Sequence, residues 1–202
     1  MPRSRLKGRM RYVQIALAAL AFYACSPAAD RAATPQDAFF SALSELCGQA
    51  FAGRLVSSDE VDVDFGKQSM VMHVRACSED EIRIPFYVGE DRSRTWVITR
   101  QSSSLRLKHD HRHEDGSEDA VTQYGGDTAD AGTATRQSFP VDDFSIEMFG
   151  REGLSASVVN VWAVEVHGDV FAYELSRPNR FFRVEFDLSA PVDVPPPPWG
   201  FE

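Results

Sequence analysis

Residues 105–114 alternate strictly between two kinds of side chain, which is the pattern of a β-strand with one buried face. One face carries Leu105, Leu107, His109, His111 and His113. The other carries Arg106, Lys108, Asp110, Arg112 and Glu114. Because five successive charges favour water, we expect the histidines to point inward with the leucines. Three of the chain's five histidines are therefore expected on one interior face.

Asp115-Gly116 predicts a tight two-residue turn at the end of this strand. That turn fixes which residues face each other across the hairpin: Arg112 and Asp119, His113 and Glu118, His111 and Ala120, His109 and Thr122, Leu107 and Tyr124. The register predicts an inward-facing ligand site made of His109, His111, His113, Glu118 and Tyr124.

Most of the remaining sequence also alternates with a period of two. The predicted strands are 49–56, 69–76, 82–88, 93–100, 105–113, 118–124, 133–139, 155–166, 170–176 and 180–188. Short turn signals separate several of them, which predicts antiparallel neighbours in a meander. Thr34-Pro35-Gln36-Asp37 predicts a helix that ends at Gly48, and residues 142–149 predict a second, short helix.

The N-terminus predicts export. Five basic residues precede an apolar run from Tyr12 to Ala24 that is short for a membrane span, so we interpret residues 1–24 as a signal peptide. The segment ending in Ala24-Cys25-Ser26 resembles the lipobox of bacterial lipoproteins. This resemblance implies that Cys25 is acylated, that residues 25–33 form a tether, and that the protein faces the periplasm from the outer membrane. Cleavage near Ala28, which would give a secreted protein, is the alternative.

We predict a mainly β domain over residues 34–190, with an antiparallel meander closing into a barrel of about eight to ten strands; a β-sandwich is the alternative. Strand number, meander order and export resemble the calycins, the lipocalin-like barrels. The Gly-x-Trp motif of lipocalins is replaced by Phe51-Ala52-Gly53. The resemblance therefore implies a lumen, but no particular ligand and no functional residues. Residues 191–202 contain four consecutive prolines and predict an extended tail, which either folds back or engages a partner.

The charge of the chain excludes nucleic acid as a partner. The net charge is −9 and the first 24 residues carry +5, so the remainder carries −14. Such an acidic surface repels a phosphate backbone. We expect Arg92, Arg94 and Arg100 on a hydrated strand face, with an anion-binding mouth as the alternative.

Two cysteines remain once Cys25 is lipidated or removed. Cys47 and Cys77 would then lie in an oxidising compartment, where we expect them to form a disulfide. Two buried thiols are the alternative. The absence of a Cys-x-x-Cys motif and of zinc-type Cys/His spacing argues against a redox or zinc role for either cysteine.

The histidine row suggests a divalent transition metal as a ligand. Alternate strand residues lie about 6.6–7 Å apart, so two adjacent members of His109, His111 and His113 can share one ion. The His-x-His part resembles the strand-borne zinc ligands of carbonic anhydrases, and His73 or Glu118 would supply the third ligand. The alternative is a hydrogen-bonded polar ladder, and a third interpretation uses His113 and Glu118 as an acid/base pair.

Three hypotheses about function follow. The first is a lipid-anchored envelope protein whose barrel binds a small molecule or metal ion through the histidine face. The second is a structural or interaction lipoprotein with a filled interior and no ligand. The third is an enzyme that uses His113 and Glu118.

Overall fold

The computed structural model describes residue 1 and residues 33–201. Almost all of the expected signal peptide, together with Cys25 and the tether as far as residue 32, lies outside the described residues. Within the described part, no helix combines the length and apolar character needed to cross a membrane.

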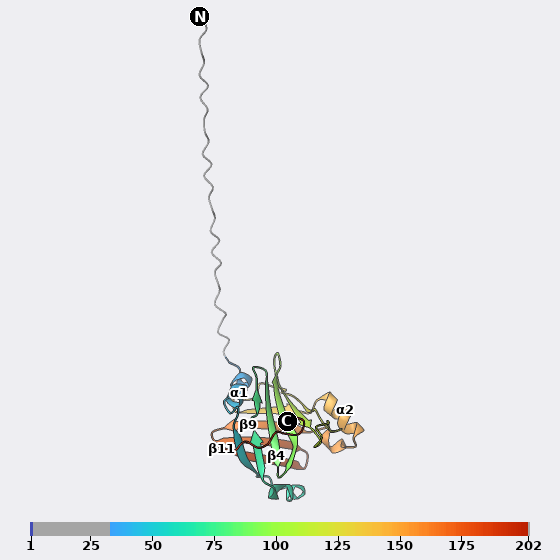
Figure 1. Cartoon of the computed structure of the whole chain (residues 1–202). Coiled ribbons are helices and arrows are strands. Elements are labelled where there is room, and N and C mark those ends of the chain that lie inside the picture. The colour runs from blue at the N-terminus through green and yellow to red at the C-terminus, as the bar shows by residue number, and fades with distance from the viewer. Residues whose placement is uncertain (2–32, 202) are drawn as a thin grey trace. The chain divides into compact units, whose positions relative to one another are not determined.

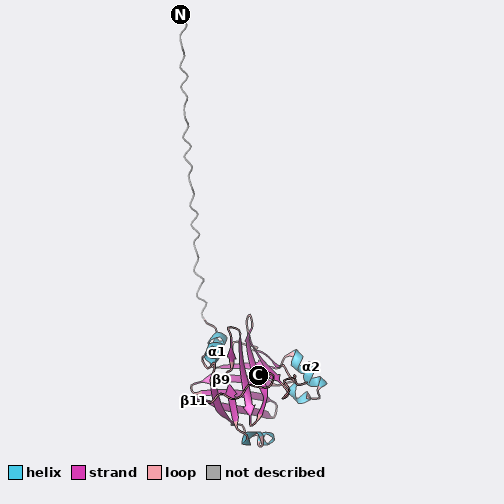
Figure 2. Ribbon diagram, viewed as in Figure 1, coloured by secondary structure: helices cyan, strands magenta, loops and turns pink. Residues whose placement is uncertain are grey.

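Eleven strands and two α-helices make up the domain, as Figures 1 and 2 show. The strands are β1 (Ala50–Leu55), β2 (Met70–His73), β3 (Ala76–Cys77), β4 (Glu81–Val88), β5 (Asp91–Arg100), β6 (Leu105–His111), β7 (Tyr124–Asp127), β8 (Arg136–Pro140), β9 (Val161–His167), β10 (Val170–Arg177) and β11 (Arg180–Val192). The helices are α1 (Pro35–Ser44) and α2 (Asp143–Arg151), with short 3-10 turns η1 (Glu60–Asp62), η2 (Phe65–Lys67) and η3 (Ser155–Ser157).

The strands form one antiparallel sheet in the order β7-β6-β5-β4-β2-β1-β11-β10-β9-β8, with β3 paired to β4 beside this path. In Figure 1 the green strands around β4 cross in front of the orange and red strands β9 to β11, as expected when a sheet curls onto itself. The prediction of a mainly β, nearly closed meander barrel is confirmed. Apolar side chains from nearly all the strands fill its deep interior.

The sheet closes at a seam between β7 and β8 that is not a regular ladder. The backbone N–H of Asp142 donates to the carbonyl of Gly125 at 2.9 Å, and the Ser145 hydroxyl accepts from the N–H of Gly125 at 2.8 Å. A Cβ placed on Gly126 would lie 1.8 Å from the carbonyl oxygen of Pro140. Two consecutive glycines therefore let the two strands approach closely enough to close the barrel.

Helix α1 begins as the sequence predicts. Thr34 and Asp37 form a reciprocal capping box, and Pro35 occupies the first helical turn. Its buried residues Phe39, Phe40 and Leu43 belong to the core. The apolar face of the helix therefore packs into the interior of the barrel.

The predicted disulfide between Cys47 and Cys77 is present, with Cα atoms 6.3 Å apart. It ties the segment after α1 to β3. Closing a loop of 30 residues stabilises the folded chain by about 3.6 kcal/mol on the chain-entropy account.

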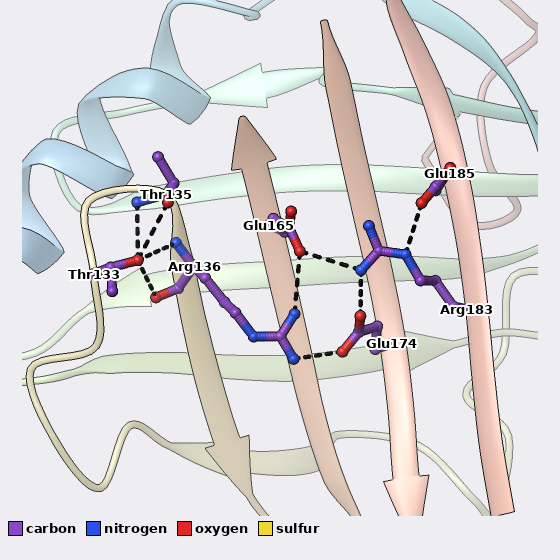
Figure 3. Close-up of polar contacts among 7 residues, drawn as sticks. All are labelled: Thr133, Thr135, Arg136, Glu165, Glu174, Arg183 and Glu185. Carbon is purple, nitrogen blue, oxygen red and sulfur yellow. Dashed lines mark hydrogen bonds and ion pairs between the residues drawn. The ribbon is translucent and has the colours of Figure 1, made fainter. Parts of the chain in front are cut away.

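The outer wall formed by β8 to β11 carries a ladder of alternating charges, shown in Figure 3. Arg136 donates to Glu165 at 3.2 Å and to Glu174 at 2.5 Å. Arg183 donates to the same two carboxylates and, at 2.8 Å, to Glu185. Burial raises the pKa of Glu174, but the hydrogen bonds from both arginines outweigh it and hold the pKa below its ordinary value. The network cross-links four neighbouring strands on the outside of the barrel.

The C-terminal segment folds back across the outside of the sheet. The backbone N–H of Trp199 donates to the Arg92 carbonyl at 3.2 Å, and Arg92 Nη1 donates to the Pro197 carbonyl at 2.9 Å. Arg75 Nη2 donates to the Phe201 carbonyl at 2.9 Å. Strand β11 also continues to Val192, past the predicted end of the domain at residue 190. The tail is therefore part of the packed domain.

The sequence predicted that the charged face of β6 is hydrated. This prediction was wrong for part of the face, because the tail covers it. The Phe201 ring lies under the guanidinium groups of Arg112 and Arg83, at 5.0 and 5.5 Å from its centroid. Asp110, beside them, is only 2 % exposed and pairs with Arg112 at 3.1 Å and Arg83 at 3.5 Å. Two guanidinium groups thus compensate a carboxylate that the tail helps to bury.

Candidate functional site

The hairpin after β6 differs from the predicted register. His109 pairs with Tyr124 rather than Thr122, and an isolated bridge joins Arg112 to Glu118 instead of placing Glu118 opposite His113. The turn is wider than two residues, because the N–H of His113 donates to the carbonyl of Ser117 at 2.9 Å. Gln123 has φ 57°, a left-handed conformation that shifts the register again just before β7. The predicted strand 118–124 is therefore replaced by β7 at Tyr124–Asp127.

The predicted pair of His113 and Glu118 does not form. His113 is exposed beyond the end of β6, so it does not belong to the interior row. Glu118 accepts instead from Arg112 at 3.4 Å. The hairpin thus leaves His109 and His111 as the two inward-facing histidines, and the acid/base pair loses its geometric basis.

His109 is held in the barrel interior by two hydrogen bonds, with 3 % of its surface exposed. Its Nδ1 lies 3.0 Å from the Tyr124 carbonyl, which can only accept, so Nδ1 carries the proton. Burial lowers the pKa of His109 to about 3, so the ring is neutral and Nε2 is an acceptor. The Tyr173 hydroxyl, 2.7 Å from Nε2, must therefore donate to it.

His111 lies one step nearer the barrel mouth. Its Nε2 is 3.1 Å from the Tyr124 hydroxyl, and Arg94 faces it across the β5–β6 ladder. Burial, with help from the charge of Arg94, lowers the pKa of His111 to about 4. Burial also raises the pKa of both Tyr124 and Tyr173, so their hydroxyls stay protonated. The two histidines and two tyrosines form a neutral hydrogen-bonded group.

This group borders a cavity of about 240 Å³ at one end of the barrel. Aromatic rings form much of its wall: Trp96 stacks on Tyr173 with centroids 4.4 Å apart and on Phe86 at 4.8 Å. The other lining residues are Asp62, Phe65, Arg94, His109, His111, Tyr124, Leu175, Arg180 and Phe182. Of the five predicted ligand-binding residues, His109, His111 and Tyr124 line this cavity, whereas His113 and Glu118 do not.

The turns η1 and η2, which are distant from β6 in the sequence, also line the cavity, through Asp62 and Phe65. Arg180 binds Asp62 through both terminal nitrogens, at 2.6 and 2.8 Å, and binds Asp59 at 2.9 Å. Phe65 packs edge-on against Phe182 with centroids 5.4 Å apart. The guanidinium group of Arg180 therefore anchors η1 and Asp59, the residue before it, to the barrel.

Arg94 makes fewer side-chain hydrogen bonds than Arg180. Within residues 33–201, only its Nη1 is hydrogen bonded. Its Nη1 donates to Asp91 at 2.6 Å. The side chain is 30 % exposed and lines the cavity beside His111. The expectation of a hydrated outer face was wrong for this residue, since Arg94 is in phase with the buried Trp96 and Ile98 along β5. That period-two relation was visible in the sequence.

The predicted metal ligands are not brought together. Across residues 33–201, no group of three or more His, Cys, Asp or Glu side chains is placed to hold a metal ion. His73 lies on β2, separated from β6 by β4 and β5, and faces away from the core-facing Met72. Both ring nitrogens of His109 are already hydrogen bonded. The predicted set of His109, His111, His113 and His73 is therefore not assembled; His109 and His111 lie on the same face and are each hydrogen bonded to tyrosine groups instead.

No protein-family model, curated protein or solved structure matches this chain significantly.

Proposed function

We propose that this protein is a lipid-anchored envelope protein whose barrel binds a small apolar molecule that carries one hydrogen-bond acceptor. The observation that carries the proposal is the cavity of about 240 Å³, walled by aromatic rings and bordered by Arg94. A cavity below the range of about 300–1,000 Å³ usual for drug-sized ligands suits a molecule of one ring and a short polar group.

The contacts favour an aromatic ring with an acceptor over a metal ion or a cation. Trp96, Phe86 and Tyr173 stack on one another and together give the cavity an apolar aromatic wall that a ligand ring can contact. Within residues 33–201 only one N–H of the Arg94 guanidinium is hydrogen bonded, and a guanidinium presents its donors in a fork that suits a carbonyl or carboxylate oxygen. The histidines supply a neutral polar border, because burial keeps both rings uncharged.

A set of three probes of similar size tests the proposal. Benzamide and benzoate should bind in the cavity, whereas benzylamine should bind at least tenfold more weakly because its ammonium group faces Arg94. Arg94→Met should weaken benzamide and benzoate about tenfold, the effect of losing one charge-assisted hydrogen bond. NMR titration that follows the indole N–H of Trp96 measures these affinities.

Arg106→Met is the matched control. Arg106 lies on the outer face of β6, bonded to Asp127 at 2.6 Å, and does not line the cavity. It removes the same charge and should leave probe affinity unchanged. If none of the three probes binds, the structural lipoprotein is favoured instead; if all three bind equally, the role proposed for Arg94 is overturned.

The membrane anchor is the second part of the proposal. It is supported by the lipobox-like Ala24-Cys25-Ser26 and by the Cys47–Cys77 disulfide, which suits an oxidising compartment. Cys25→Ser should move the protein from the membrane to the soluble fraction of a Gram-negative host and abolish lipid labelling. Unchanged fractionation of this variant, with no lipid on the wild type, would show that the protein is secreted or held in another way.

A further inference from the structure

A second cavity, of about 220 Å³, adjoins the first. His111, Tyr124 and Leu175 line both, so these three side chains form the wall between them. The second cavity is also lined by residues from the turn after β6 and from the segment between α2 and β9. The two cavities are therefore neighbours on either side of one wall of side chains.

The wall consists of side chains, and one hydrogen bond holds its polar part. Tyr124 Oη and His111 Nε2 are 3.1 Å apart, and Leu175 completes the wall with an apolar contact surface. Rotation of the His111 ring can open this bond without breaking the backbone pairing of β6 with β5. A ligand group that offers Tyr124 or His111 a replacement hydrogen bond would offset the loss.

The lining of the second cavity includes a donor and an acceptor, Arg177 and Asp119. Arg177 Nη1 donates to the Asn160 side chain at 3.1 Å, and its other nitrogens make no recorded hydrogen bond among the described residues. One carboxylate oxygen of Asp119 accepts from the N–H of Val121 at 2.8 Å. The other makes no hydrogen bond within residues 33–201. A group with both an acceptor and a donor, such as a carboxamide, complements this pair. A simple anion or cation would meet one of the two charges unfavourably.

We propose that the two cavities are the halves of one elongated site for an aromatic amide that carries a second amide-bearing arm. The ring would contact the aromatic wall of the first cavity, the first carbonyl would meet Arg94, and the arm would pass His111 to bring its terminal amide to Arg177 and Asp119 in the second cavity. Together the two volumes fall within the range usual for ligand sites, which neither reaches alone. This inference rests on the proposed function and specifies its ligand class.

Comparing benzamide with N-benzoylglycinamide tests it, because the second probe is the first with a glycinamide arm. On the wild-type domain, N-benzoylglycinamide should bind at least tenfold more tightly by NMR titration. Arg177→Met should remove most of this gain and leave benzamide unchanged. Arg151→Met, an exposed arginine of α2 that pairs with Glu152 and lines neither cavity, should change neither affinity.

A second variant guards against a folding defect in Arg177→Met. Leu154 is 40 % exposed and lines the second cavity, so Leu154→Trp should fill it and selectively weaken the longer probe. If benzamide binds but the longer probe binds no better, or if these variants weaken both probes equally, the elongated site is overturned and the single-cavity function stands. If neither probe binds the wild type, the proposed function itself fails.

Discussion

Gly126→Ala should lower the free energy of unfolding by at least about 3 kcal/mol, because it forces the seam of the barrel apart. The new Cβ would lie 1.8 Å from the Pro140 carbonyl oxygen and 3.3 Å from the Asp142 nitrogen. Both neighbours are backbone atoms, so no side chain can rotate away. The strands at the seam would have to separate by more than 1 Å, which exceeds the strain of ordinary core overpacking at about 1–3 kcal/mol.

Gly150→Ala is the matched control for this substitution. Gly150 lies within α2, has no positive φ, and a Cβ there would meet nothing within 4 Å. Alanine at this position should raise stability by about 0.5–1 kcal/mol, because glycine is the poorer helix former. Urea unfolding of both variants separates the two cases. A loss below about 1 kcal/mol for Gly126→Ala would mean that the seam is not a closed contact.

The fold was accessible from the sequence because its signals are local. Alternation along residues such as those of β5, β10 and β11 defines strands without knowledge of their partners, and short turns then make them antiparallel. The capping residues Thr34 and Asp37 likewise define the start of α1. The seam was not accessible, since Gly125 and Gly126 look like a turn unless the approach of Pro140 is known.

The candidate site was only partly accessible, because register depends on details of turns. The prediction that His109 and His111 face inward needed only the alternation of β6, and it is confirmed by their position at the cavity. The partners across the hairpin depended on Asp115-Gly116 being a two-residue turn, and this was wrong. Asp115 forms an Asx turn, in which its side chain accepts from the N–H of Ser117 at 2.9 Å, and this turn favours a wider hairpin loop.

Other parts of the site come from segments whose position no local pattern reveals. The salt bridge of Arg180 with Asp62 joins residues 118 positions apart, and it places η1 over the cavity. The burial of Asp110 depends on Phe201, from a proline-rich tail that the sequence left undecided between two roles. Long-range ion pairs and tail docking are therefore the features that the structure adds to the sequence.

Acidification from about pH 7 to pH 5 should lower the stability of the domain by about 3 to 4 kcal/mol. Burial lowers the pKa of His109 to about 3 and that of His111 to about 4, against an ordinary value of 6.5. Unfolding frees both rings to take up protons, so the unfolded chain binds more protons than the folded one in this range. Stability is therefore retained above about pH 6.5 and is lost progressively as the pH falls toward 4.

His109→Gln isolates one of the two contributions. The glutamine amide can donate to the Tyr124 carbonyl and accept from the Tyr173 hydroxyl, the two bonds that His109 makes, but it does not titrate. Urea unfolding at both pH values should show about half the wild-type pH dependence in this variant, even if its stability near pH 7 is lower. His167→Gln, at the exposed end of β9, should keep the wild-type dependence. An unchanged pH dependence in His109→Gln would mean that His109 gains access to protons in the folded barrel, and that the cavity it borders is wet and open rather than a closed apolar site.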